Sequence, residues 1–158
     1  MPAPEILFVK YAFPCAFILR QRGEITEAEL SSLEDAALHG KILPRPFLER
    51  IFFRAFRRIG VLAREMGKEV WEYDVIRSYF VTRHNEIISE GRETYANAPE
   101  SLRELCMVHE SVIQSLDGEV LVVKYGEKNR PVNGGMIPSP AVGERVTIHY
   151  GYAIERVK

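Results

Sequence analysis

The side chains best suited to chemistry in this sequence are a cysteine and two histidines in its last third. Cys106 and His109 are separated by two residues, a spacing that metal sites use, and His149 lies near the end of the chain. A cysteine acts as a nucleophile or metal ligand in its thiolate form, which a neighbouring histidine favours. Thiolate and imidazole together suit iron or zinc. The sequence predicts a partner- or metal-binding site at Cys106 and His149, with His109 as an additional candidate ligand.

Plainer interpretations stand beside this prediction. A lone cysteine is usually a small buried hydrophobe. Apolar and polar side chains alternate over residues 145–150, so the apolar set is expected to face a core. His149 then lies on the outward or cleft-facing side, where a solvated strand histidine needs no function. A structural four-ligand site would also need Cys15 or a carboxylate such as Glu110.

A nearly continuous motif surrounds both groups. Residues 142–156 read V-G-E-R-V-T-I-H-Y-G-Y-A-I-E-R, and residues 106–126 begin C-M-V-H and end V-V-K-Y-G. Members of the HypC/HupF family of hydrogenase maturation chaperones open with a cysteine and a short apolar strand. They close with V-G-D-x-V-x-V-H-x-G-F-A-I-x-K. Residues 106–158 therefore resemble this family, whereas residues 1–105 resemble no family that we recognise.

The resemblance implies both a fold and a function. The implied fold is a compact OB-like barrel. The implied function is [NiFe]-hydrogenase assembly, in which the chaperone binds a maturation scaffold protein and the hydrogenase large-subunit precursor. It helps deliver an iron group that carries cyanide and carbon monoxide ligands. Cys106 would contact the partner and the iron transiently, and His149 would orient the thiol or act as a second iron ligand.

Two departures from the family pattern surround the cysteine. In the family the cysteine follows the initiator methionine, whereas Cys106 has 105 residues before it. A chemistry that needs a free amino group beside the thiol is not available to the intact chain. The family also has a proline soon after the cysteine, and the run C-M-V-H-E-S has none.

Composition bounds the remaining possibilities. The chain has 158 residues with 46% hydrophobic and 27% charged side chains, typical of a globular protein of one domain or two small ones. A formal net charge of −1 gives no general attraction to nucleic acid or membranes. Two cysteines make no disulfide scaffold, which favours a cytoplasmic location. No nucleotide-binding glycine loop or hydrolase motif is present, so an independent enzyme is not favoured.

The first part of the chain is expected to be helical, with a domain boundary between residues 98 and 99. Thr26 and Glu29 form a capping box that begins a helix ending at Gly40. Proline lacks the backbone donor, so Pro14 should break or kink the first helix. The other expected features are helices at residues 6–20, 47–66 and 70–89, a stop at Gly91, a linker at residues 92–99 and a helical turn at residues 100–105.

The last part has the pattern of short strands. Asp117-Gly118 separates two β-rich runs, residues 108–116 and 119–125, which predicts a hairpin. Residues 145–150 alternate as a further strand. The expected fold class is α+β, with an all-helical domain at residues 1–98 followed by a small OB-like barrel domain at residues 99–158.

Other functions remain open on the sequence alone. An OB-like barrel without maturation chemistry would bind nucleic acid or protein, with a weak set of aromatic and basic side chains at Tyr125, Lys124, Lys128, Arg130 and Tyr150. A second basic stripe, which includes Arg50 and Arg54, is expected to be the solvated or ion-paired face of an amphipathic helix. A small metal-binding regulator is a third alternative.

Overall fold

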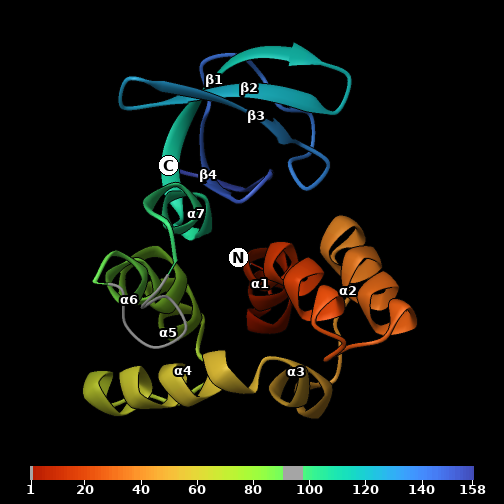
Figure 1. The fold of residues 1–158 in the computed structure, drawn as a ribbon, viewed down its shortest axis with the longest axis vertical. Helices are drawn as coiled ribbons and strands as arrows, with labels where there is room; N and C mark the ends of the chain where they lie inside the picture. The colour runs from red at the N-terminus through yellow and green to blue at the C-terminus, as the bar shows by residue number, and fades with distance from the viewer. Residues whose placement is uncertain (1, 91–97) are drawn as a thin grey trace. The chain divides into compact units, whose positions relative to one another are not determined.

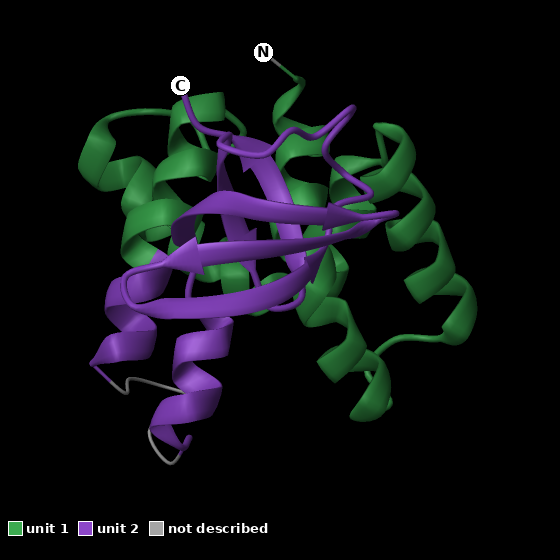
Figure 2. Cartoon of the chain, turned by 90° about the horizontal axis from the view of Figure 1, so that it is seen from above, with its two compact units in different colours: residues 1–83 green, residues 84–158 purple. Residues whose placement is uncertain are grey.

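The chain folds into two compact units, residues 1–83 and 84–158. The computed structural model describes residues 2–90 and 98–158 (Figure 1), and Figure 2 colours the two units separately. The sequence placed the boundary between residues 98 and 99, whereas the structure divides the chain between Arg83 and His84. The described part of the chain contains no helix that is long and apolar enough to cross a membrane.

The first unit is helical, and its core is aromatic. The Phe8 ring lies 5.3 Å from the Phe52 ring, 4.6 Å from Phe56 and 5.8 Å from Trp71. The Tyr11 and Phe80 rings stack at 5.2 Å. The helical segments of this unit are α1 (Pro4–Gln21), α2 (Glu27–His39), α3 (Arg45–Ile51), α4 (Phe53–Met66), α5 (Tyr73–Ser78) and the π-helix η1 (Tyr79–Arg83).

Both predicted ends of α2 are confirmed. The Thr26 side chain accepts from the Glu29 amide while the Glu29 carboxylate accepts from the Thr26 amide, so the capping box is confirmed. Gly40 ends α2 in the left-handed conformation, as expected for its position. The stop expected at Gly91 and most of the expected linker lie outside the described residues.

The helices differ from the expectations at three places. Pro14 does not break α1, which continues through it because its long buried face outweighs the one hydrogen bond that proline cannot donate. The helix expected over residues 47–66 is divided at Phe52, whose backbone angles (φ −103°, ψ 42°) are not helical. The helix expected from residue 70 begins at Tyr73 and contains the π-helical segment η1.

In the residues described, the second unit combines the short helices α6 and α7 with a closed β-barrel. The expected α+β class, a helical part followed by a small barrel, is confirmed. Its strands follow the order β1-β2-β3-β5-β4, in which β3 and β5 are parallel and the other neighbours antiparallel. The elements are α6 (His84–Ser89), α7 (Glu100–Cys106), β1 (His109–Asp117), β2 (Val120–Tyr125), β3 (Lys128–Asn133), β4 (Arg145–His149) and β5 (Tyr152–Arg156).

The barrel encloses an aliphatic core. As the alternation predicted, Val146 and Ile148 of β4 point into it. The expected hairpin is confirmed at Gly118, which joins β1 to β2 with a φ of 60°. The remaining core members come from the other strands and the loop after β3 and are Ile113, Leu121, Val123, Val132, Ile137 and Ala153.

Candidate functional site

Cys106 is the last residue of α7, and its side chain is almost fully buried. Its sulfur shares a hydrogen bond with the hydroxyl of Tyr150, a residue 44 positions later in the chain. Tyr150 directly follows β4, inside the closing motif seen in the sequence. The fold therefore brings the cysteine and the closing motif to one place.

Tyr150 holds an unusual backbone conformation. Its φ of 53° lies in the left-handed region, which costs a non-glycine residue on the order of 1–3 kcal/mol. Two backbone contacts hold it there. The Tyr150 amide donates to the Leu105 carbonyl at 3.1 Å, and the Tyr150 carbonyl accepts from Arg130 Nη1 at 3.0 Å.

Arg130 extends this arrangement across the barrel. It is 8% exposed, and its Nη2 donates to the Tyr125 hydroxyl at 2.8 Å. The guanidinium carbon also lies 4.9 Å from the centroid of the Tyr125 ring. The other side of this contact involves His109, whose ring stacks with Tyr125 at 4.7 Å. We call this group of contacting residues the thiol cluster. Its members are Cys106, His109, Tyr125, Arg130 and Tyr150.

His109 is held by α7 as well as by Tyr125. Its Nε2 is hydrogen-bonded with the Glu104 carbonyl at 2.9 Å. Burial lowers the pKa of His109, the nearby charges of Arg130 and Lys128 lower it further, and the Glu104 contacts only partly oppose them. The imidazole is therefore neutral near pH 7 and able to exchange a hydrogen bond or accept a ligand.

The thiol itself is not activated in this state. Burial raises the pKa of Cys106, and the hydrogen bond with Tyr150 offsets that rise only in part. Cys106 is therefore protonated near neutral pH, and its thiol is unreactive in this state. Nucleophilic or ligand chemistry at this sulfur requires a change that exposes it or stabilises its thiolate.

His149 departs from the expected position. Its side chain points away from the aliphatic core, as the alternation required, yet it is fully buried and neither solvated nor cleft-facing. The His84 ring of α6 packs against it edge-to-face at 5.2 Å, and the Tyr150 ring lies 5.1 Å from it. A helix covers the outer side of the strand, which periodicity within the strand cannot reveal.

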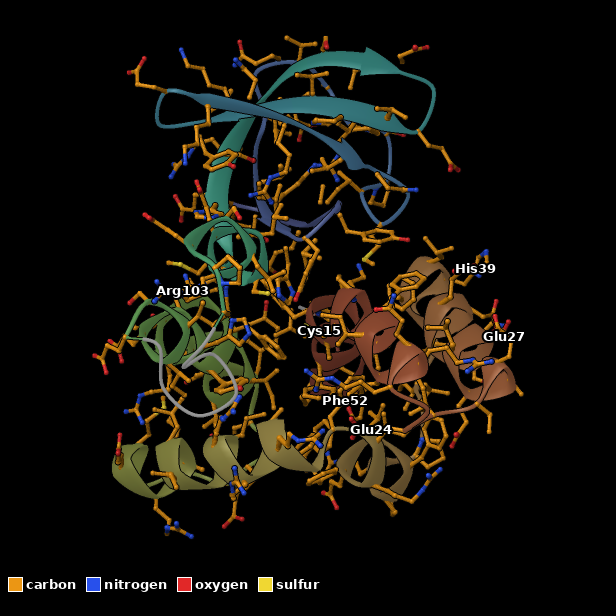
Figure 3. All side chains as sticks on the ribbon, in the orientation of Figure 1. Cys15, Glu24, Glu27, His39, Phe52 and Arg103 are labelled. Atoms are coloured by element: carbon orange, nitrogen blue, oxygen red, sulfur yellow. The ribbon has the colours of Figure 1, made fainter. Side chains whose placement is uncertain are left out.

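The structure gives a position to each candidate metal ligand. Among residues 2–90 and 98–158, no group of three or more histidine, cysteine or acidic side chains is arranged to hold a metal ion. Cys106 and His109 both belong to the thiol cluster, and His149 adjoins it through Tyr150. Cys15 lies on α1 in the other unit, and Figure 3 labels it. The Glu110 carboxylate pairs with Arg145 at 2.7 Å.

A hollow of about 340 Å³ opens beside the thiol cluster, with His109 in its wall. The other lining side chains include Lys128 of β3 and three residues of α7, Glu100, Arg103 and Glu104. Figure 3 labels Arg103. Lys128 and Glu104 form an ion pair. Both charge signs line this hollow, so it selects no single charge class of ligand.

Arg50 and Arg54 of the basic stripe are ion-paired, although they lie on two helices, α3 and α4, and not on one. Arg54 pairs with Glu24 at 2.7 Å and Arg50 pairs with Glu29 at 2.6 Å. These pairs lie on the surface, where each contributes little to stability. The stripe offers no argument for nucleic-acid binding.

The sequence did not identify Tyr150 as the partner of Cys106, or Arg130 as the partner of Tyr150. Both were noted only as aromatic and basic candidates for nucleic-acid contact. The closing motif pointed to the correct segment, but the prediction chose His149, whereas the residue that contacts Cys106 is Tyr150. No protein-family model matches this chain, and no curated protein matches it either.

Proposed function

We propose that this protein assists assembly of a [NiFe]-hydrogenase, with its barrel as the partner-binding unit. One observation carries the proposal, namely the hydrogen bond that joins Cys106 to Tyr150 of the closing motif. The two segments that carry the resemblance to HypC/HupF chaperones are distant in sequence, and they meet at the thiol. The strand order β1-β2-β3-β5-β4 is also that expected of an OB-like barrel, which the resemblance implies.

The proposed partners are a maturation scaffold protein and the hydrogenase large-subunit precursor. Iron enters as cargo that carries cyanide and carbon monoxide ligands, and not as a resident cofactor of this chain. The protein acts in the cytoplasm as a chaperone and not as an independent enzyme. Cys106 supplies the contact with the partner and the iron group, and His149 packs against the ring of the neighbouring Tyr150.

Partner binding must change the state of the thiol. In the free protein Cys106 is buried and protonated, so a partner has to displace part of α7 or the turn at Tyr150 to reach the sulfur. Helix α7 has seven residues and no side-chain N-cap, and a helix this short has little stability of its own. Leu102 and Leu105 on α7 are each 41% exposed and give a partner apolar surface beside the thiol.

The competing function is an OB-like binding module without maturation chemistry. Nucleic acid would need accessible aromatic and basic side chains on the barrel. Arg130 is buried in the thiol cluster, Lys128 is ion-paired with Glu104, and Tyr125 is stacked with His109. These contacts favour protein binding over nucleic-acid binding.

The test is an anaerobic affinity purification from the native host, comparing wild type with Cys106→Ala. Co-purifying proteins are identified by mass spectrometry and iron by metal analysis. Cys15→Ala is the matched control, because it removes the other cysteine from the other unit. We expect hydrogenase precursor or scaffold protein with wild type and Cys15→Ala, and neither with Cys106→Ala. Absence of both proteins from the wild-type sample contradicts the proposal.

A further inference from the structure

Three polar groups of Tyr150 form hydrogen bonds near Cys106, and one of them reaches the sulfur. Its hydroxyl meets the Cys106 sulfur, its amide meets the Leu105 carbonyl beside that cysteine, and its carbonyl meets Arg130. A tyrosine with a positive φ is uncommon and persists where its surroundings hold it. Strain of this kind is found most often at functional sites.

We propose that Tyr150 is a positioning residue for the Cys106 thiol, and that Arg130 acts through Tyr150 by holding its backbone in place. The proposal rests on the proposed function, in which Cys106 is the working thiol. It assigns to Tyr150 the orienting role that the resemblance implied for His149.

The chemistry of the pair supports this assignment. A tyrosine hydroxyl can donate or accept a hydrogen bond, so it can bond the sulfur in either protonation state. When the thiol releases its proton to solvent, the Tyr150 hydroxyl donates to the thiolate. A hydrogen bond to the charged form favours that form.

Arg130 is placed to control this contact without touching the sulfur. Its Nη1 bonds the Tyr150 carbonyl, while its Nη2 is anchored on the Tyr125 hydroxyl. Because Arg130 is buried, loss of its guanidinium leaves the Tyr150 carbonyl without its charged donor. The left-handed turn then relaxes, and the hydroxyl moves from the sulfur.

The experiment is an NMR titration of Cys106 in the full-length chain. Protein carrying Cys15→Ser and ¹³Cβ-labelled cysteine gives one signal, whose chemical shift follows ionisation of Cys106. The variants are Tyr150→Phe, which keeps the ring and loses the hydroxyl, Arg130→Gln, and the two combined. If Arg130→Gln fails to fold, Tyr125→Phe replaces it, because that change loosens Arg130 by removing one hydrogen bond.

We expect Tyr150→Phe to raise the midpoint by about 0.5–1 pH unit, the effect of losing one hydrogen bond to the thiolate. Arg130→Gln should raise it in the same direction. In the Tyr150→Phe background, Arg130→Gln should not raise the midpoint further, because both changes remove the same hydrogen bond between Tyr150 and Cys106.

An unchanged midpoint in Tyr150→Phe overturns the proposal. A shift from Arg130→Gln that is equally large in both backgrounds overturns the role of Arg130 through Tyr150. The titration needs no partner, so its result is independent of the affinity purification. Absence of both partners from the wild-type purification, together with the expected Tyr150→Phe shift, would therefore reject the proposed function and leave the positioning role intact.

Discussion

Asn85 of α6 ties the segment that follows Cys106 to the second unit. Its Nδ2 donates to the Val108 carbonyl at 2.8 Å, and its Oδ1 accepts from the Val108 amide at 2.8 Å. Val108 is 5% exposed and lies just before β1. One side chain thus satisfies both backbone groups of a buried residue.

Asn85→Ala removes both hydrogen bonds and leaves two buried backbone groups without these partners. Each unsatisfied group costs about 1–3 kcal/mol. Some relaxation and water entry reduce the sum, so we expect the free energy of unfolding of the second unit to fall by about 2–4 kcal/mol. Cys106 lies two residues before Val108, so its alkylation should accelerate as well.

The assay is hydrogen exchange of barrel-core amides by NMR, which measures opening of this unit. Asn129→Ala is the matched control, because Asn129 is exposed on β3 and its loss should change stability by less than about 0.5 kcal/mol. Asn85→Asp adds a second test. Its ionised carboxylate repels the Val108 carbonyl, whereas a protonated carboxyl below about pH 4 can donate to it.

Equal effects of Asn85→Ala and Asn129→Ala would refute this reasoning. So would an Asn85→Asp variant that is as stable as wild type near pH 7. Either result would mean that the paired amide contacts contribute nothing beyond an ordinary surface asparagine.

Three further predictions concern separate parts of the chain. Gly134→Ala places a Cβ 2.7 Å from the Leu121 side chain in the barrel core, so barrel amides should exchange faster by the equivalent of about 1–3 kcal/mol. Burial lowers the pKa of His109 in the folded protein, so below about pH 6.5 the unfolded state binds more protons than the folded state. The stability of the barrel should therefore fall as the pH drops through that value, and it should fall less in His109→Gln. Thr26→Ala removes the capping box and should destabilise the first unit by about 1 kcal/mol, measured by fluorescence of Trp71 in that unit.

Each of these predictions has a control. Gly151→Ala places its Cβ in open space and should leave barrel exchange nearly unchanged. Ser31→Ala removes an exposed hydroxyl within α2 and should not lower the stability of the first unit. His39→Gln changes a histidine of the first unit, so the barrel should keep its wild-type pH dependence. A variant that matches its control contradicts the corresponding prediction.

Features set by neighbouring residues were predictable from the sequence. The capping box at Thr26, the left-handed stop at Gly40 and the hairpin at Gly118 each depend on a few adjacent positions. The inward direction of Ile148 likewise follows from the period of a strand. These features need no knowledge of the rest of the fold.

Features set by distant residues were not predictable. The periodicity of β4 gave the direction of His149, but its burial depends on what covers the strand, including α6. The partner of Cys106 depends on the left-handed turn at Tyr150, which no local signal in the sequence indicates. Arg130 and Tyr150 meet only after the barrel closes, since they belong to different strands and turns.

The Asn85–Val108 pairing limits how this chain can be shortened. A fragment that begins at residue 99 keeps every strand yet lacks α6 and its Asn85 amide. A fragment that begins at Cys106 also lacks the Leu105 carbonyl, which the Tyr150 amide bonds. A fragment that starts at His84, the first residue of the second unit, keeps both the Asn85 amide and the Leu105 carbonyl. The two helices that precede the strands, α6 and α7, therefore belong to the same unit as the barrel and are not an interchangeable attachment.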